Sequence, residues 1–468
     1  MTLTRTITVA AGVFAPGHLG ELTWQVPFEL ADCVLADALA AGRRLRDLPS
    51  RTGLYFVLAL GLFPQLGYLN VWRKLTAALE GAPGVPSPSA KALRDLRRRV
   101  GAAPLRALFE VLAGPAAQPS TPGVRFGRYR TVSFDGCNSV KVPDTARNRA
   151  WLGKQGPSTG ETGYPAIELM TLVETGTRAL LGAVSGPRTG ETGYARQLMH
   201  LLTADMLVLT DRGFDSAGFL QAVAATGARF LARLTSCRLL PAAARLDDGT
   251  YLARIGELTV RVIDAQVTVT LATGSRFTAR YRLATTLTDF RRYPAAALIR
   301  LYHERWEHEV AYLALRHTLL NGRVLRSRDP AGLKQEIWAL LAVYQAIRRE
   351  MVLAAETVPG TDPDRASFTV ALQAATGTIA SPRVIPGPRP CGRIGHAVLA
   401  ALLPPRRPRV SMRKIKSPLS RWHRTTPHRP ARSTPLACIT TTLNDPPQPA
   451  PRKPRKHRRK TLTAAPSP

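Results

Sequence analysis

The sequence is short of acidic residues. Its 468 residues include 32 Asp and Glu against 65 Lys and Arg, which gives a formal net charge of +33 at pH 7. A polyanionic partner, either nucleic acid or an anionic membrane surface, suits such an excess because basic side chains displace the polymer's condensed counterions. A small neutral ligand would not require it.

Long hydrophobic runs are also missing. The longest apolar stretch, Leu54 to Phe63, has ten residues, whereas a membrane-spanning helix needs about 20. We therefore expect a buried core helix there and no membrane partner, which leaves nucleic acid. The N-terminus lacks a basic region leading into an apolar core, so we expect no signal peptide.

Cysteine is scarce and unpaired in its spacing. The five residues, never in a CxxC pair, are Cys33, Cys137, Cys237, Cys391 and Cys438. This pattern indicates neither a disulfide framework nor a zinc site and fits a reducing cytoplasm. With 45% hydrophobic and 21% charged residues, the chain is expected to be mostly globular, with two to four domains for its length.

Two Pro/Gly-rich breaks, at 81–89 and 114–123, mark off the N-terminal part. Apolar residues recur there at three- and four-residue spacing, which predicts an all-helical domain over residues 1–115. Ser89 is placed to cap a helix that carries a run of cations. This basic face points either to solvent or to a phosphate backbone, and its members are Lys91, Arg94, Arg97, Arg98 and Arg99.

Beyond residue 124 the pattern changes to short strand-like runs with helical stretches between them. This order predicts an α/β catalytic core with a mixed sheet over 124–235 and 290–355. Alternating runs over 236–289 predict a β-rich insertion, and long helices are expected over 294–320 and 333–353. The sequence GETGY occurs twice, ending at Tyr164 and Tyr194; we interpret both copies as similar turns without a firm function.

The last segment, 381–468, is basic and rich in proline. It holds 20 of the Lys and Arg residues against one acid, Asp445, and 18 of the 38 prolines. Such a segment cannot bury enough apolar surface to fold compactly, so we expect it to be largely disordered.

Two carboxylates follow strand-like runs. Asp135 comes at the end of RYRTVSFD, and Asp211 comes directly after MLVLT. Carboxylates that leave strands at one edge of a sheet converge, and converging carboxylates are what Mg²⁺ requires. A single Asp at a strand end is more often a turn former or a helix cap, so neither is decisive alone.

A third acid lies in a helical stretch. Tyr302, Arg305, Glu309 and Arg316 have offsets of 0, 3, 7 and 14, which at 100° per residue places them within about 60° of one another on one face. A carboxylate flanked by cations is suited to binding a metal while adjacent phosphates are held. An ordinary amphipathic helix with ion pairs gives the same spacing.

Together these motifs resemble a known family. Phe134-Asp135-Gly136, Asp211-Arg212-Gly213-Phe214 and the Tyr302, Arg305, Glu309, Arg316 set are similar to the three catalytic motifs of insertion-sequence DDE transposases, in the insertion-sequence-four branch with its Y-R-E-K signature. The similarity runs from about residue 20 to 350. It implies a ribonuclease H-like catalytic core that cuts the element's DNA ends and joins them to target DNA.

The resemblance also implies site roles. Asp135, Asp211 and Glu309 would hold two Mg²⁺ ions, with Mn²⁺ able to substitute, and Tyr302, Arg305 and Arg316 would contact DNA near the cut. The N-terminal region would bind the terminal inverted repeats, for which the basic face offers Lys91, Arg94 and Arg98. Relatives act as a homodimer or larger synaptic complex, which we expect here, in the bacterial cytoplasm at the nucleoid.

The sequence departs from the family at two places. Position 316 is Arg where the signature has Lys, which changes a point charge to a planar fork. No Trp occurs between Ser236 and Asp289, where some relatives stabilise a flipped base during hairpin formation. Two other functions stay open: a DNA-binding protein that has lost catalysis, and a nuclease that cuts without joining.

Overall fold

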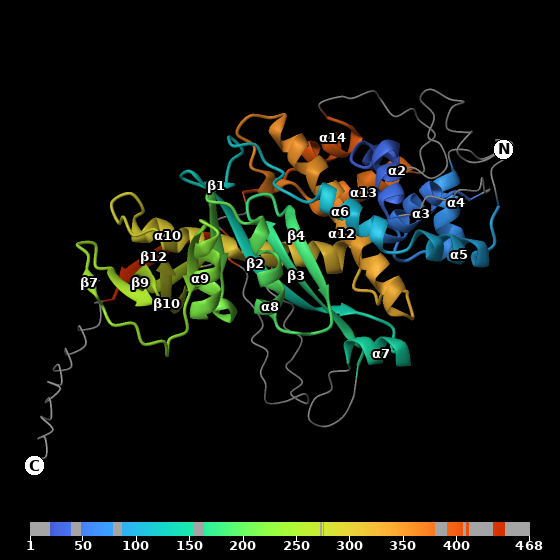
Figure 1. The fold of residues 1–468 in the computed structure, drawn as a ribbon. Coiled ribbons are helices and arrows are strands. Elements are labelled where there is room, and N and C mark those ends of the chain that lie inside the picture. The colour runs from blue at the N-terminus through green and yellow to red at the C-terminus, as the bar shows by residue number, and fades with distance from the viewer. Residues whose placement is uncertain are drawn as a thin grey trace, which may run out of the picture.

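The computed structural model describes residues 19–38, 48–77, 87–153, 163–271, 274, 276–379, 391–405, 409–410 and 434–444. Figure 1 shows a twisted sheet in the middle of the molecule, with most helices gathered at the end that holds the N-terminal segments. None of the helices in these ranges is long and apolar enough to cross a membrane.

A mixed sheet carries the α/β part, as the sequence predicts. Its strand order is β11-β12-β9-β10-β6-β5-β2-β3-β4, with β1 paired to β2 and the hairpin of β7 and β8 attached to β9. Strand β5 lies parallel to β2 and β6, whereas the other pairs are antiparallel. The central strands are β2 (Tyr129–Lys141), β3 (Ala166–Glu174), β4 (Leu180–Gly186), β5 (Met206–Thr210) and β6 (Arg229–Arg233).

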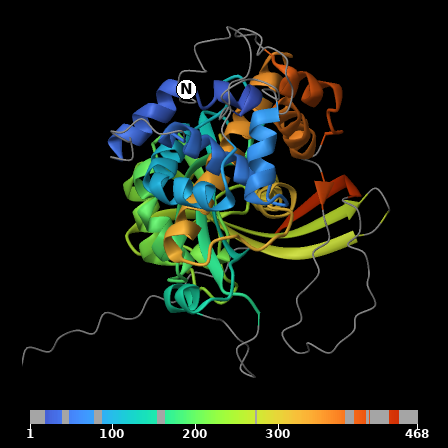
Figure 2. The ribbon, with the colours of Figure 1, turned by 90° about the vertical axis from the view of Figure 1, so that its right-hand side faces the viewer.

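The β-rich insertion continues this sheet. Its strands are β7 (Ala244–Arg245), β8 (Tyr251–Ile255), β9 (Leu258–Leu271) and β10 (Arg276–Thr285), and β1 (Arg125–Phe126) precedes the core. Strand β10 pairs with β6, so the insertion is an extension of the catalytic sheet. Figure 2 shows β9 and β10 reaching away from the main body of the molecule.

Part of the basic tail joins the sheet. Strand β12 (Thr434–Leu443) pairs antiparallel with β9, and β11 (Arg409–Val410) pairs with β12; Figure 2 shows β12 in red beside the two long strands. Helix α14 (Arg393–Ala400) packs on α12 and α13. The expectation of disorder over 381–468 is therefore wrong for 391–405 and 434–444, and the rest of that segment lies outside the described residues apart from 409–410.

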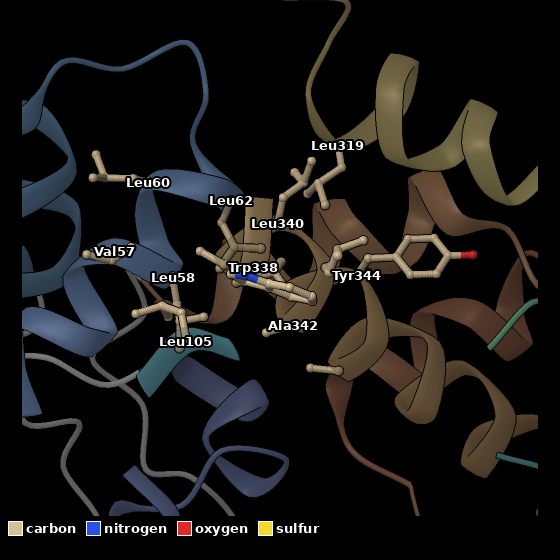
Figure 3. Packing of buried hydrophobic residues seen from close by; sticks show 14 of the residues in the cluster. Val57, Leu58, Leu60, Leu62, Leu105, Leu319, Trp338, Leu340, Ala342 and Tyr344 are labelled. Carbon is tan, nitrogen blue, oxygen red and sulfur yellow. The ribbon is translucent and has the colours of Figure 1, made fainter. Parts of the chain in front are cut away.

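The N-terminal helices do not have a core of their own. They are α2 (Phe28–Asp37), α3 (Ser50–Leu62), α4 (Tyr68–Thr76), α5 (Ala90–Val100) and α6 (Ala103–Leu112), and they pack around α12 (Pro330–Glu356) and α13 (Phe368–Ile379). Leu58 and Leu105 belong to the same buried cluster as Trp338, Leu340 and Tyr344 of α12 (Figure 3). The hydrophobic core of the predicted N-terminal domain is thus completed by α12, which begins after residue 329.

A buried ion pair fixes this packing. Arg97 of α5 was expected on the basic face, but it is only 5% exposed. Its Nη2 donates to Glu336 Oε1 at 2.8 Å, and its Nε donates to Gln335 Oε1 at 2.6 Å, both on α12. Arg99 likewise turns back to donate to the Leu48 carbonyl. These two cations therefore serve the fold.

The predicted helix over 294–320 is not one regular helix. It consists of α10 (Ala295–Tyr302), a 3-10 turn over His303–Arg305, α11 (Trp306–Leu313) and a π-helical segment over Ala314–Leu319. Because the number of residues per turn changes three times, a helical wheel at 100° per residue does not hold across the whole stretch. Helices α8 (Glu191–Gln197) and α9 (Ala217–Ala225) pack against the sheet, and α7 (Ala146–Leu152) follows β2.

Replacing Arg97 with Met should strongly destabilise the chain. The change leaves the Glu336 carboxylate buried without its cation, which typically costs about 3–5 kcal/mol. The control is Arg98→Met, since Arg98 is 70% exposed and its ion-pair partner Asp95, 3.6 Å away, is 53% exposed; it should change stability by less than about 0.5 kcal/mol. Urea unfolding of the full chain measures both, and equal effects would contradict the docking described for α5.

Candidate active site

The parallel register of β2 and β5 brings two acids level with each other. Ser133 pairs with Leu209, so continuing by two residues on each strand sets Asp135 beside Asp211. Strand β2 runs on to Lys141 along β3, which places Asp135 inside a strand instead of at its end. The predicted convergence of the two carboxylates follows directly from this register.

Local hydrogen bonds hold each aspartate. The Asp135 Oδ1 accepts from the Gly136 N–H at 3.0 Å. Asp211 Oδ1 accepts from the Gly213 N–H at 2.8 Å and caps the 3-10 turn Arg212–Phe214. Asp211 is therefore both a cap and a site residue, and the two interpretations of this position do not exclude each other.

Arg305 connects the third acid to this pair. Its Nη1 lies 3.9 Å from Asp135 Oδ2, and its Nη2 lies 3.7 Å from Glu309 Oε1. The Arg305 side chain is only 9% exposed. The guanidinium thus stands between two carboxylates that come from β2 and α11, and the helix-face prediction is confirmed for this pair of residues.

The electrostatics of Asp135 show that the acids act on one another. Burial raises the pKa of Asp135 to about 7 against the opposing charge of Arg305, and the neighbouring charges of Asp211 and Glu309 contribute to this rise. A carboxylate is normally kept in such a place only if a cation can balance it. Additional positive charge would therefore stabilise the ionised form of these three acids.

The other two signature residues, Tyr302 and Arg316, differ from the expected arrangement. Tyr302 is only 3% exposed and packs its ring edge to face against Tyr281, 5.9 Å away. Arg316 lies on the π-helical segment, where its Nη2 is 3.2 Å from the His317 Nε2. In this conformation DNA cannot contact Tyr302, and the π segment removes the basis for placing Arg316 on the Glu309 face.

The three cations expected to bind DNA from the N-terminal region are all exposed. Lys91, Arg94 and Arg98 lie on the outer side of α5, which Figure 1 shows among the N-terminal helices and apart from β2. They form a surface separate from the acids, as expected for contacts to a different part of a DNA molecule.

A buried polar network, which the sequence did not reveal, positions Glu309. His308 is fully buried, with Nδ1 2.8 Å from Ser133 Oγ and Nε2 2.7 Å from Thr171 Oγ1. The Thr171 hydroxyl donates to Tyr312 OH at 3.0 Å, and Tyr312 OH donates to the Asp135 carbonyl at 2.7 Å. Helix α11 is therefore attached through two of its residues to the strand that carries Asp135.

A buried arginine attaches the same helix from another side. Arg178 is 2% exposed, and its Nε donates to Glu307 Oε2 at 2.6 Å while its Nη2 binds Asp364. Glu307 and His308 directly precede Glu309, so both anchors act next to the proposed site. The available sequence signal was the run of three polar residues, Glu307-His308-Glu309, within a predicted helix.

A fourth acid, also missed, lies beside the two aspartates. Glu191 begins α8 in the second GETGY copy, and a Cβ atom built on Gly136 would lie 2.6 Å from its Oε1. One built on Gly213 would lie 3.5 Å from its Oε2. The repeated motif was the available signal, but repetition alone gave no reason to prefer a site over a turn; the first copy lies largely outside the described residues.

The donor set suits a hard divalent cation. Within the described ranges no three His, Cys, Asp or Glu residues are assembled to hold one ion as they stand. However, all the acids offer oxygen atoms, the class of ligand that Mg²⁺ prefers. The Arg305 guanidinium already occupies a cation's place between Asp135 and Glu309. The chemistry of the residues therefore fits a divalent metal ion, for which Asp135, Asp211 and Glu309 would be the oxygen ligands.

Two protein-family models match the chain. One is "Insertion element 4 transposase N-terminal", over residues 16–110, and the other is "Transposase DDE domain", over residues 129–346. The exposed cations of α5 lie in the first range, and Asp135, Asp211 and Glu309 lie in the second.

Relatives with curated names agree with these models. "Transposase InsG for insertion sequence element IS4" of Escherichia coli (strain K12) is 27% identical over 350 residues, which is 73% of this chain and 78% of that protein. "Putative transposase InsZ" of the same organism is 27% identical over 154 residues, 33% of this chain and 49% of that protein.

Among solved structures, the chain resembles a piggyBac transposase in a synaptic complex with hairpin DNA. The match covers 84% of this chain and 87% of that one, with 10% identity and a TM-score of 0.40. A TM-score this low supports no argument about function.

His303, in the 3-10 turn between α10 and α11, provides a test of the packing around the site. His303 stacks on Tyr281, and burial followed by the charge of Arg233 lowers its pKa to about 4. The unfolded chain therefore binds a proton near pH 6.5 that the fold does not bind. This contribution to stability is present above pH 6.5 and is lost as pH falls toward 4, by about 1.4 kcal/mol per pH unit.

A His303→Phe variant keeps the ring and removes the titration. As the pH falls from 6.5 to 4, the free energy of unfolding of the variant should rise progressively relative to that of the wild type. Urea unfolding at each pH measures this difference. Comparing the two proteins cancels every other titrating group. A stability difference that does not change with pH would contradict the burial of His303.

Proposed function

Because the chain belongs to the insertion-element-4 family of DDE transposases, we propose that Asp135, Asp211 and Glu309 are its catalytic acids. The protein is a DNA transposase, and its DDE domain implies dependence on a divalent metal ion. We further propose that the metal is Mg²⁺, that two ions take part, and that Mn²⁺ can substitute.

One observation supports this proposal above the others, namely that the three acids share a single electrostatic environment. The register of β2 and β5 sets Asp135 beside Asp211, and Arg305 lies within 4 Å of both Asp135 and Glu309. Residues that serve only as turn formers or as one half of a surface ion pair have no reason to converge from two strands and a helix.

The chain's own groups would prepare the phosphodiester for displacement. When bound, the metal supplies activation of the attacking water or 3′-hydroxyl and stabilisation of the leaving oxygen. Asp135, Asp211 and Glu309 hold it, and the His308 and Tyr312 network keeps Glu309 in register with Asp135. Arg305 balances the acids before metal enters and is then available to a DNA phosphate.

The same reaction would serve both cleavage at the element's ends and strand transfer into target DNA. We assign recognition of the terminal inverted repeats to the N-terminal helices, with Lys91, Arg94 and Arg98 contacting the phosphate backbone. Arg316 would contact DNA near the cut, and Tyr302 would do so only if its packing against Tyr281 opens. A homodimer would bring two ends together in a synaptic complex, in the bacterial cytoplasm at the nucleoid.

Glu309→Gln should abolish cleavage while binding to the element's ends persists. The substitution keeps the shape of the side chain but removes the charge that balances a metal, so the cleavage rate should fall by roughly four orders of magnitude. Adding Asp135→Asn should cost little more, because both residues support the same ion. Nicking of a terminal-repeat duplex in Mg²⁺ measures the rate.

Glu257→Gln is the matched control, because Glu257 is 90% exposed in the turn between β8 and β9. It should cleave at the wild-type rate. A Glu309→Gln protein that nicks nearly as fast as the wild type would overturn the catalytic assignment. Joining of pre-cleaved ends to a target plasmid, assayed separately, distinguishes a transposase from a nuclease that only cuts.

Arg305→Gln should separate metal binding from catalysis. Removing the guanidinium takes away a cation that competes for Asp135 and Glu309, so Mn²⁺ should bind the DNA-free protein more tightly, by about 1 kcal/mol or fivefold. DNA cleavage should fall, because the phosphate contact is lost. Electron paramagnetic resonance of Mn²⁺, at pH 8.5 where Asp135 is ionised, measures the affinity. Weaker Mn²⁺ binding in the variant would show that Arg305 organises the acids.

A further inference from the structure

The position of Glu191 is defined by two glycines. Gly136 directly follows Asp135, and Gly213 follows Asp211 by two residues. A Cβ atom on Gly136 would lie 2.6 Å from Glu191 Oε1 and 2.8 Å from its Cδ, a separation that real side chains do not show. A Cβ on Gly213 would lie 3.5 Å from Glu191 Oε2 and 3.0 Å from Asp211 Oδ1. The Gly136 backbone thus leaves space that the Glu191 carboxylate fills, whereas at Gly213 the carboxylate lies at an ordinary van der Waals distance.

The segment before Glu191 is fixed from behind by another buried acid. Glu168 of β3 is 1% exposed, and its Oε2 accepts from the backbone N–H groups of Thr189 at 2.8 Å and Gly190 at 3.3 Å. Gly190 has a φ of +104°, a conformation that L residues rarely adopt. The start of α8 is therefore built so that Glu191 emerges toward Asp135 and Asp211.

More negative than positive charges act on Glu191. The charge of Glu191 is repelled by both Asp211 and Glu168 and attracted by Arg188. In addition, the second oxygen of Glu168, Oε1, is buried and has no hydrogen-bond partner among the described residues. A buried carboxylate oxygen without a partner is costly. The cluster of Glu168, Glu191 and Asp211 thus contains a buried oxygen atom whose hydrogen-bonding capacity is not used.

We propose that Glu191 is a fourth acidic residue of the metal site, which binds a divalent cation together with Asp211 while Glu168 supports it from behind. The inference rests on the proposed function, since it concerns the same metal. It adds a second pair of oxygen donors beside Asp211, next to Gly136 and Gly213.

A structural role is the competing explanation. An acid in the first turn of a helix stabilises it by about 0.3–1 kcal/mol through the helix dipole, and Glu191 occupies such a position. That role affects thermal stability in the absence of metal. It does not affect the affinity for a metal, so the two explanations predict different measurements.

The test is Mn²⁺ binding to the full chain on a pre-cleaved terminal-repeat duplex, by isothermal titration calorimetry and electron paramagnetic resonance. We compare the wild type with Glu191→Gln, Asp135→Asn and the remote control Glu257→Gln. Glu191→Gln should weaken Mn²⁺ binding about tenfold or more and reduce the number of bound ions or alter the Mn²⁺ spectrum, because affinity follows the number of charged ligands. Glu257→Gln should match the wild type.

A second variant tests the geometry without removing any acid. Gly136→Ala introduces a Cβ where Glu191 Oε1 now lies, so it should displace that carboxylate and also weaken Mn²⁺ binding. Melting temperatures in EDTA report how far either change affects the fold itself.

The outcomes separate the two proposals. If Glu191→Gln lowers the melting temperature in EDTA but leaves Mn²⁺ affinity and spectrum at wild-type values, while Asp135→Asn weakens binding, Glu191 has only a structural role. The catalytic assignment then stands and this inference fails. If Asp135→Asn also binds Mn²⁺ like the wild type, the proposed metal site itself is wrong.

Discussion

Repulsion among carboxylates gathered at one edge of a sheet is the constraint on which this structure depends. The parallel register of β2 and β5 sets Asp135 beside Asp211, α11 adds Glu309, and α8 adds Glu191. Burial raises the pKa of Asp135 to about 7, so the charged form of this carboxyl is unfavourable in its surroundings. Arg305 offsets part of the repulsion from its position between Asp135 and Glu309.

Hydrogen bonds and an ion pair from the surrounding structure hold α11, and with it Glu309, in place against this repulsion. Helix α11 is attached to the sheet through His308 and Tyr312 and to a buried cation through Glu307 and Arg178. Neutral groups make the first attachment, since burial holds the pKa of His308 down at about 3 and the histidine adds no charge of its own. His308 and Tyr312 therefore hold the helix that carries Glu309 without adding charge to the site.

The helical part of the molecule extends this support. Helix α12 follows the catalytic helix in the chain, packs against the N-terminal helices, and receives Arg97 from α5 through Gln335 and Glu336. The surface proposed to bind the element's ends is therefore coupled through one core to the helical stretch that leads from Glu309. In a protein that must hold a DNA end and cut it at a fixed distance, such coupling keeps the two contacts at a constant separation.

Local patterns in the sequence were enough to predict β2 through β6, because these strands are apolar runs, and to single out Asp135, Asp211 and Glu309 as candidate acids. The tertiary structure alone decided what depends on partners distant in the chain. It buried Arg97 against Glu336, placed Arg316 on a π-helical segment that a helical wheel does not predict, and added β12 to β9 from a segment too basic and proline-rich to look folded. It also brought Glu191 to Gly136, 55 positions away in the chain, and to Gly213, 22 positions away. Apart from the contact with Gly213, these contacts join residues 55 or more positions apart, and local periodicity contains no information about them.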